Sequence, residues 1–294
     1  MAVTIRPIAG SFAAEAIGAD ISRPLDGATV ATLQAAIDAH AVLVFHGQRL
    51  ADDQQVRFAQ QFGEPERYAL AYRHDIKLRL QKPEMVDVSN LDAETGKPEA
   101  GAARLRMINL GNRLWHTDSS FRLPCGALSM LYAHVVPPAG GETEFADTRA
   151  AWEALPEATK ARIDGLEAEH WLMHSRAMLG FTDFAPEEKA ALPPVRQPLV
   201  RVHPRTGRKA LYLASHASHV IGMPVPEGRL LLAELTEHAG QREFVHRHSW
   251  RVGDLVIWDN RCTMHRGRPF DEAFARDLRR VTTKNLPAAE SVAA

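Results

Sequence analysis

Two histidines and one aspartate are the residues whose types and spacing point most directly to chemistry. His116 and Asp118 stand two positions apart, and His265 follows near the other end of the chain. Side chains two positions apart in an extended segment point the same way, so this pair can face one metal ion. Two imidazoles and one carboxylate can cover one face of Fe(II) and leave the opposite positions open. The pattern therefore predicts a non-haem iron site and oxygen chemistry.

The cysteines do not suggest a structural zinc site in its place. Such a site is closed by a fourth ligand, which is usually a cysteine. The two cysteines of this chain, Cys125 and Cys262, stand alone without paired spacing. Three protein ligands instead leave room on the metal for a cosubstrate.

Three further residues supply what a bound dicarboxylate needs. Arg276 and Arg280 follow His265, and Thr143 follows Asp118. A guanidinium group binds a carboxylate through two parallel charge-assisted hydrogen bonds, and a threonine hydroxyl can add a third contact. We therefore expect a dicarboxylic acid beside the metal.

These residues and their spacing resemble the TauD/TfdA family of dioxygenases, which use Fe(II) and 2-oxoglutarate. The likeness is strongest to the 2,4-dichlorophenoxyacetate dioxygenase branch of the family, and it runs from about residue 3 to about residue 285. It includes segments away from the motif, such as Ala41–Phe45, Thr143–Asp147 and Pro226–Leu232. The resemblance implies that the chain is an enzyme, an oxidoreductase that degrades an aromatic compound.

The resemblance also implies a role for each motif residue. His116, Asp118 and His265 bind Fe(II) and form the catalytic group. Arg276, aided by Thr143, pairs with the distal carboxylate of 2-oxoglutarate, whose keto acid end chelates the metal and leaves one position for O2. The implied reaction hydroxylates an aryloxyalkanoate such as 2,4-dichlorophenoxyacetate at the carbon next to the ether oxygen. It releases a phenol and glyoxylate, together with succinate and CO2.

Arg280 is the candidate for binding the substrate carboxylate. On a strand, Arg276 and Arg280 share a face while Arg279 points away. A buried arginine without an anion is costly, so two inward arginines imply two bound anions. The alternative is that Arg280 pairs with a fixed acid such as Asp259 or Asp147.

His216, His219 and Asn112 are further candidates for substrate contacts. In the resembling enzymes the region of the two histidines lies near the substrate, and Asn112 stands four residues before His116. Histidines are often partly buried for structural reasons, and asparagine is common in turns, so plain structural roles stay open.

The order of predicted elements indicates a mainly β fold with peripheral helices. Short extended segments separated by turn residues are typical of a double-stranded β-helix, the cupin-like jelly roll. A chain of 294 residues can form one large core, so we expect a single catalytic domain over 1–294. The predicted strands span residues 3–8, 41–45, 127–136, 166–172, 199–203, 209–214, 243–250, 254–258 and 278–283, and the predicted helices include 28–39 and a helix that Asp52 and Asp53 cap.

Two segments interrupt this pattern. Residues 65–112 are irregular apart from a strand near 85–89, and they lead directly to His116. A loop this long in a compact domain usually covers or shapes a site, so we predict an active-site lid there, against the alternative of a solvated insertion. Asp147 and Pro156 can each begin a short helix, which predicts a helical insertion outside the sheets over 147–195.

Composition excludes some partners. The net charge of −1 provides no basic face for nucleic acid or an anionic membrane. No apolar run approaches a membrane span, and the first residues lack the order of a signal peptide. Unpaired cysteines suit a reducing compartment, so we expect a cytoplasmic protein with a small-molecule aromatic carboxylate as its partner. Homo-oligomerisation stays open.

Several other functions are alternatives to this prediction, and each differs from it in a feature that can be tested. The same chemistry on another aromatic carboxylate or on a sulfonate is the nearest alternative. A zinc hydrolase would need a general base for the metal-bound water and would ignore 2-oxoglutarate. A non-catalytic barrel that binds a small acid would keep its ligand affinity without Asp118. An iron halogenase would replace that carboxylate with a small residue.

Overall fold

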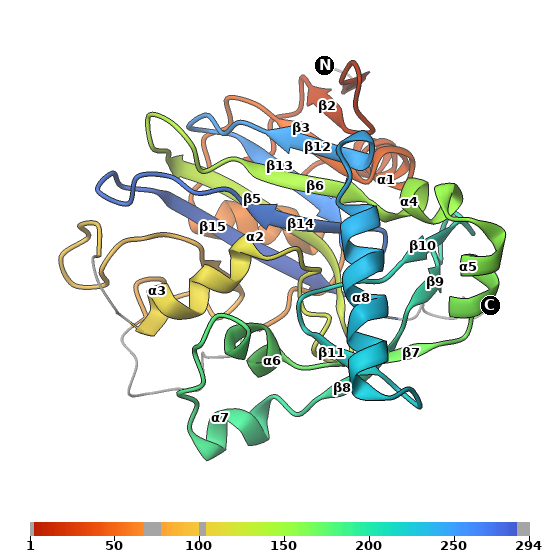
Figure 1. The fold of residues 1–294 in the computed structure, drawn as a ribbon. Helices are drawn as coiled ribbons and strands as arrows, with labels where there is room; N and C mark the ends of the chain where they lie inside the picture. Colours follow the sequence, from red (N-terminus) through yellow and green to blue (C-terminus); the bar gives the residue numbers. More distant parts are fainter. Residues whose placement is uncertain (1–2, 68–77, 100–103, 287–294) are drawn as a thin grey trace, which may run out of the picture.

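A seven-stranded sheet is the largest element of the computed structural model, which describes residues 3–67, 78–99 and 104–286 (Figure 1). Its neighbouring strands pair antiparallel, except that β2 runs parallel to β3. In spatial order the strands are β1 (Thr4–Pro7), β2 (Ala14–Ile17), β3 (Val42–Phe45), β13 (Leu255–Asp259), β5 (Gly126–Val135), β15 (Asp277–Lys284) and β4 (Met85–Asp87).

Smaller sheets complete the β structure. A three-stranded sheet with β6 at its centre packs against the inner face of the large sheet, and a second three-stranded sheet and a two-stranded ribbon extend the fold. Their strands are β12 (Val245–His248), β6 (Thr143–Asp147) and β14 (Thr263–Gly267); β11 (Ala217–Val220), β7 (Glu167–His170) and β8 (Val195–Pro198); and β10 (Lys209–Leu211) with β9 (Val200–Val202).

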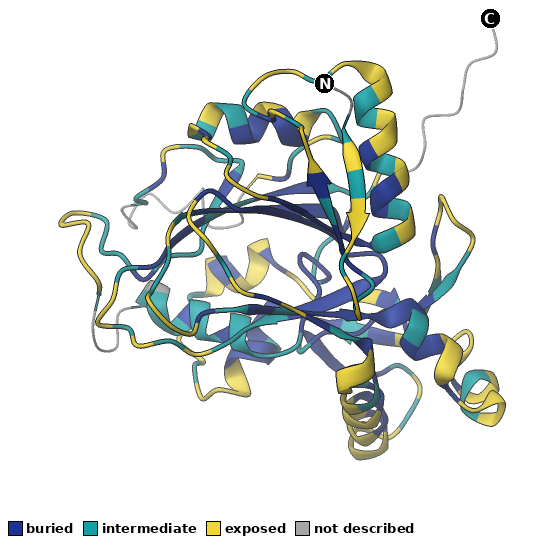
Figure 2. Ribbon diagram, turned by 90° about the horizontal axis from the view of Figure 1, so that it is seen from above, coloured by how far each residue is buried: buried dark blue, intermediate teal, exposed yellow. Residues whose placement is uncertain are grey.

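Strand β3 shows how side-chain alternation builds two cores. Val42 and Val44 point between the sheets, where they join Phe145 of β6 in one apolar cluster. Leu43 and Phe45 point to the opposite face and belong to a second cluster. A strand buried on both faces reads as a continuous apolar run, as the sequence of β3 does. Figure 2 shows the buried strands as two facing layers with exposed helices outside them.

Two helices cover the outer face of the large sheet. In α1 (Gly27–His40), Leu33 and Ile37 lie one turn apart and enter the same cluster as β3. Helix α2 (Asp52–Gln60) adds Val56 and Phe58. Burial of each such side chain contributes roughly 1.5–3 kcal/mol relative to exposure. The predicted cap of α2 was wrong by one residue: Ala51 is the N-cap, and the two acids stand in the first turn, where their charge favours the positive helix end.

Four short helices and strand β7 lie in the range 147–195, and strand β8 begins at the last residue of this range. Asp147 caps α4 by accepting hydrogen bonds from the backbone N–H groups of Arg149 and Ala150. These helices are α4 (Thr148–Ala154), α5 (Glu157–Ile163), α6 (Leu172–Ala177) and α7 (Pro186–Ala191). The longer α8 (Val225–Ala239) packs with α4 on the outer side of the β6 sheet.

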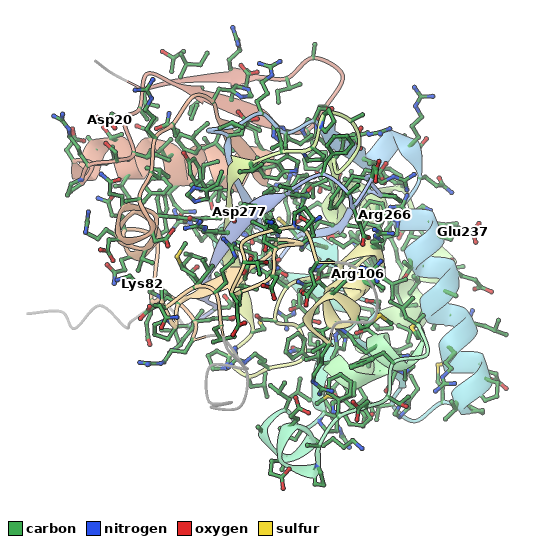
Figure 3. The ribbon with its side chains drawn as sticks, turned by 90° about the vertical axis from the view of Figure 1, so that its left-hand side faces the viewer. Asp20, Lys82, Arg106, Glu237, Arg266 and Asp277 are labelled. Atoms are coloured by element: carbon green, nitrogen blue, oxygen red, sulfur yellow. The ribbon has the colours of Figure 1, made fainter. Side chains whose placement is uncertain are left out.

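The range 65–112 contains more regular structure than predicted. Arg79 donates hydrogen bonds to Asp87 and Asp277, which fastens β4 to the edge of the large sheet. Helix α3 (Arg104–Asn109) and a 3₁₀ helix (Leu110–Arg113) then lead to His116. Figure 3 looks onto this side of the molecule, with Arg106 of α3 and Asp277 near its middle. Residues 68–77 and 100–103 of the predicted lid lie outside the described residues.

The two facing sheets with helices at the periphery form the jelly roll that the sequence predicts. Among the described residues, no helix has both the length and the apolar character needed to cross a bilayer.

Candidate metal centre and its two cavities

Backbone pairing brings the two histidines of the predicted triad together. His116 donates its N–H to the carbonyl of His265 at 3.0 Å, and the reverse bond measures 2.8 Å. His116 belongs to none of the named strands, and this isolated bridge joins it to His265 of β14. The two imidazole rings therefore lie side by side, with centroids 4.1 Å apart.

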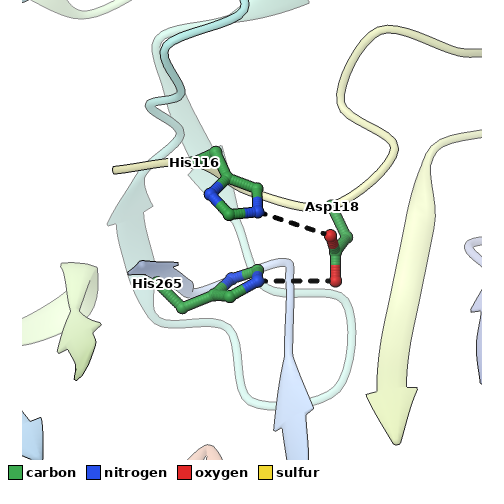
Figure 4. A group of neighbouring side chains, drawn as sticks. All are labelled: His116, Asp118 and His265. Atoms are coloured by element: carbon green, nitrogen blue, oxygen red, sulfur yellow. Dashed lines mark ion pairs between the residues drawn. The ribbon is translucent and has the colours of Figure 1, made fainter. Parts of the chain in front are cut away.

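Asp118 completes a compact group with the two imidazoles (Figure 4). Nε2 of His116 lies 3.7 Å from Oδ1 of Asp118, and Nε2 of His265 lies 3.7 Å from Oδ2. These distances are too long for hydrogen bonds but suit donors that each stand about 2.0–2.2 Å from a shared ion. All three residues are at most 5% exposed.

The hydrogen bonds of His116 fix which ring nitrogen can bind a metal. Its Nδ1 lies 2.8 Å from the carbonyl oxygen of Leu114. A carbonyl can only accept, so Nδ1 carries the hydrogen and Nε2 keeps a free electron pair. This Nε2 is buried and has no hydrogen-bond partner among the described residues. A metal ion would satisfy it.

The electrostatics of the group favour neutral imidazoles and an ionised carboxylate. Burial lowers the pKa of His116 and His265, and for His265 the neighbouring imidazole adds to this effect. Burial opposes ionisation of Asp118, but Arg280 and the two imidazoles outweigh it, so the pKa of Asp118 is lowered. Metal ligands need these protonation states. The donor set fits Fe(II), and no fourth protein ligand closes the group among the described residues.

Three residues hold Asp118 in place, and none of them was predicted from the sequence to do so. Ser129 of β5 donates a hydrogen bond to Oδ2 at 2.7 Å, and Asn260 accepts the Asp118 backbone N–H at 3.1 Å. Asn260 also donates to the Ser129 hydroxyl at 2.9 Å. Arg280 donates from Nη1 to Oδ1. Asn260 stands five residues before His265, and nothing in its residue type marks it for this role.

One cavity beside the triad, which we name the Arg276 cavity, contains the predicted 2-oxoglutarate residues. Arg276 is 8% exposed and donates hydrogen bonds to the carbonyls of Val88 and Gly141 at 3.0 and 3.4 Å. No carboxylate of the described residues pairs with it. Burial lowers its pKa to about 10. The cavity is lined by Val88, Leu131, Thr143, Trp258, His265 and Arg276, together with residues of α3 and the loop before β15.

Thr143 lies at the start of β6 and is 3% exposed. Its hydroxyl oxygen accepts a hydrogen bond from Nε1 of Trp250 at 3.0 Å. The hydroxyl hydrogen is therefore free to be donated to a bound group.

A second cavity, which we name the Phe121 cavity, also borders His116. His216 lies in its wall, with its ring 4.8 Å from that of Phe121 and 6.0 Å from that of His116. Burial holds the pKa of His216 well below its usual value, so the ring is neutral. Asn112 and Arg280 line both cavities. Other lining residues are Glu66, Ile108, Leu172, Arg122 and Arg176.

His219 is not among the lining residues of either cavity. It stands three residues after His216, and its Nδ1 interacts with Ser218 and lies 3.9 Å from Glu169. Its side chain is 28% exposed. We therefore leave His219 out of the proposed site.

Arg280 pairs with neither of the acids considered for it in the sequence. Asp147 pairs with Arg149, and Asp259 pairs with Arg261. The carboxylate partner of Arg280 is instead Asp118, which is a predicted metal ligand. This contact could not be predicted from the sequence, because it joins Asp118 in a loop to Arg280 on β15, which lies far away along the chain.

A second group with metal-binding residue types was not predicted. His203, Asp259 and Cys262 are all buried and lie close together. Asp259 already accepts hydrogen bonds from His203 at 2.9 Å and from the guanidinium of Arg261. Burial raises the pKa of the Cys262 thiol well above its usual value, so the thiol is protonated in the metal-free protein. This group is a closed ion-pair cluster rather than a metal site.

Comparison with known proteins places these observations in a family. Residues 4–282 match the family model described as taurine catabolism dioxygenase TauD, TfdA family. The chain is 48% identical to the alpha-ketoglutarate-dependent 2,4-dichlorophenoxyacetate dioxygenase of Cupriavidus pinatubonensis, over 96% of this chain and 98% of that protein. It is 35% identical to the (S)-phenoxypropionate/alpha-ketoglutarate-dioxygenase of Delftia acidovorans, over 98% and 97%.

A solved structure of AAD-2 in complex with Mn(II) and N-oxalylglycine aligns with a TM-score of 0.92 and 49% identity, over 97% of this chain and 98% of that one. The predicted resemblance, jelly-roll fold and enzyme class are thereby confirmed. The chain belongs to the TauD, TfdA family of dioxygenases.

Proposed function

We propose that the protein is an Fe(II)- and 2-oxoglutarate-dependent dioxygenase that acts on an aryloxyalkanoate such as 2,4-dichlorophenoxyacetate. For an aryloxyacetate, hydroxylation of the carbon next to the ether oxygen gives a hemiacetal, which collapses to a phenol and glyoxylate. The names of the relatives support both parts of this proposal, because they specify alpha-ketoglutarate, which is 2-oxoglutarate, and phenoxy acids.

A buried arginine without an acidic partner is the observation that carries the proposal. Arg276 lies in a cavity that His116 and His265 also line, yet within the described residues its guanidinium contacts only backbone carbonyls and the ring of Phe270, 5.6 Å away. A buried cation is unfavourable without an anion. A dicarboxylate that reaches the metal with one end and Arg276 with the other meets this need. A zinc hydrolase does not require such a dicarboxylate for its reaction.

Each residue around the metal would have a distinct role. His116, Asp118 and His265 hold the ion, and Thr143 donates its free hydroxyl hydrogen to the 2-oxoglutarate carboxylate. When bound, Fe(II) and 2-oxoglutarate supply the oxidation of a C–H bond by O2, with succinate and CO2 as coproducts.

The Phe121 cavity suits an aromatic acid. Phe121, Leu172 and Ile108 give it apolar walls, and Arg280 gives it a cation beside Asp118. A substrate carboxylate on Arg280 would set the position of the carbon next to the ether oxygen relative to the metal. The neutral ring of His216 and the amide of Asn112 can orient the ether and the aromatic ring.

A product assay tests the proposal. Protein with Fe(II), 2-oxoglutarate and O2 is incubated with phenoxyacetate, 2,4-dichlorophenoxyacetate, both enantiomers of a phenoxypropionate, cinnamate and an indole acid. We expect phenol and succinate in equal amounts from at least one phenoxy acid. Failure to bind 2-oxoglutarate would contradict the reaction class. Binding of 2-oxoglutarate without phenol from any phenoxy acid would contradict only the substrate.

A further inference from the structure

Within the described residues, only one nitrogen of the Arg280 guanidinium forms a hydrogen bond. Its Nη1 donates to Oδ1 of Asp118, while its Nε is buried without a partner among the described residues. Nη2 makes no hydrogen bond within the described residues either. In arginine, Nε–H and Nη2–H form one edge of the planar group and can bind a carboxylate side by side. That edge is free while Nη1 stays on Asp118.

Arg280 borders space that a ligand can enter, although its Nε atom is itself buried. The residue lines both cavities, and its side chain is 15% exposed. Arg276 has no comparable link to the metal centre, because its guanidinium contacts the carbonyls of Val88 and Gly141. Of the two arginines, Arg280 alone contacts a predicted metal ligand.

We propose that Arg280 couples substrate binding to metal binding, because one guanidinium is shared between the substrate carboxylate and Asp118. This inference rests on the proposed function, in which Arg280 binds the acid. A free guanidinium beside Asp118 withdraws charge from that ligand and repels a dication. A carboxylate on the Nε–Nη2 edge offsets the positive charge, so Asp118 becomes a stronger ligand. Linkage requires the reverse effect as well: the metal tightens binding of the acid by the same factor.

Metal affinity measures this coupling without any turnover. Mn(II) is titrated into the intact protein under anaerobic conditions with saturating 2-oxoglutarate, which keeps its own place on the metal filled. The titration is done alone, with saturating phenoxyacetate, and with 2-phenoxyethanol, which lacks the carboxylate. We expect phenoxyacetate to lower the Kd of Mn(II) about tenfold, within the usual range of such couplings. Phenoxyethanol should leave it unchanged.

Arg280→Lys tests whether the shared guanidinium is the cause. Lysine keeps the positive charge but has no planar edge, so it cannot bind Asp118 and a carboxylate in the same way. We expect the variant still to bind Mn(II) and the coupling to fall below about twofold at saturating acid. Arg247→Lys, at an arginine that is 54% exposed and lines neither cavity, is the matched control and should keep the coupling.

Three outcomes would overturn the inference. Phenoxyacetate that is turned over normally without changing Mn(II) affinity would contradict the coupling and leave the proposed function intact. A tenfold effect that persists in Arg280→Lys would show that the coupling does not depend on the shared guanidinium. Absence of any phenoxyacetate binding or turnover would remove the proposed substrate and this inference together.

Discussion

The two cavities beside His116 differ in what builds them. The Arg276 cavity takes Leu131, Thr143, Trp258 and His265 from strands of the two facing sheets, and α3 and the loop before β15 complete its lining. The Phe121 cavity takes most of its lining from loops and short helices, including Glu66, Phe121 and residues of α3 and α6. Strands are held by continuous hydrogen-bond ladders, whereas connecting segments tolerate change more readily. Under the proposed function, the 2-oxoglutarate side of the site therefore depends on the sheets more than the substrate side does.

This division explains why a family shares one reaction and differs in substrates. The predicted metal ligands and Arg276 need fixed geometry: His265 belongs to β14, the backbone of His116 pairs with it, and Arg276 directly precedes β15. A change of one small group in an apolar pocket alters discrimination by about 1–3 kcal/mol only. Variants confined to one cavity test whether the two are independent. Their effects should decrease from the metal ligands to single residues of the substrate wall.

Loss of a metal ligand has the largest expected effect. Asp118→Ala removes the anionic ligand of the triad, so we expect succinate formation to fall by at least about a thousandfold. Binding of Fe(II) or Mn(II) should weaken strongly. The measurements are succinate release and a metal titration. Asp164→Ala, at an exposed acid that pairs with Lys209, is the matched control. Near-normal activity in Asp118→Ala would contradict the assignment of the site.

Arg276→Gln should affect the Arg276 cavity and leave the other cavity largely unchanged. Loss of a buried charged partner costs about 2–5 kcal/mol, which corresponds to a rise of about 30-fold to a few thousandfold in the KM for 2-oxoglutarate. The KM for the aryloxy acid, measured at saturating 2-oxoglutarate, should change less than threefold. Arg247→Gln removes an arginine that is 54% exposed and provides the control. Equal effects on both KM values would show that the cavities are not independent.

Glu66, which lines the Phe121 cavity, makes the free energy of unfolding of the protein depend on pH. Burial raises the pKa of Glu66 from 4.5 to about 7. The folded protein therefore binds a proton that the unfolded chain has lost, and the free energy of unfolding falls as pH rises from about 4.5 to about 7. The decrease is on the order of 3 kcal/mol. Glu66→Gln should lack it, as denaturant unfolding of both proteins at pH 5 and pH 8 will measure.

The same pH dependence in wild type and Glu66→Gln would show that Glu66 is ionised throughout this range. Its hydrogen bond from Ser119 at 2.6 Å and the nearby Arg122 would then outweigh burial.

The smallest expected effect separates the two predicted substrate histidines. His216→Ala should raise the KM for the aryloxy acid about tenfold, because His216 lines the Phe121 cavity. His219→Ala should change it less than twofold, since this residue lies outside the lining of both cavities. Steady-state kinetics with varied acid and saturating 2-oxoglutarate distinguish them. A larger effect of His219→Ala would contradict the position proposed for the substrate.

The sequence was sufficient to predict the parts that depend on residue type and strand alternation. His116 and Asp118 face one side because they are two positions apart, and Arg276 and Arg280 follow the same rule. The alternating segments also predicted the jelly roll. The sequence could not predict the parallel pairing of β2 with β3, because both pairings give the same local pattern.

Contacts between distant polar residues were the main features that the sequence did not provide. Ser129, Asn260 and Arg280 meet at Asp118 only because β5, β15 and the turn after β13 are neighbours in the folded chain. Serine and asparagine are common in many roles, so residue type offered no reason to select them. The helix α3 was missed because its six residues are too few for a clear helical period.

The central claim is that one Fe(II), held by His116, Asp118 and His265, binds 2-oxoglutarate anchored on Arg276. It is tested most directly by titrating 2-oxoglutarate into the Fe(II)-loaded protein without O2 and recording visible absorption. We predict a charge-transfer band that saturates at one equivalent of 2-oxoglutarate, and that Arg276→Gln reaches saturation only at much higher concentration. Fe(II)-loaded protein that develops no band at any 2-oxoglutarate concentration would contradict the claim.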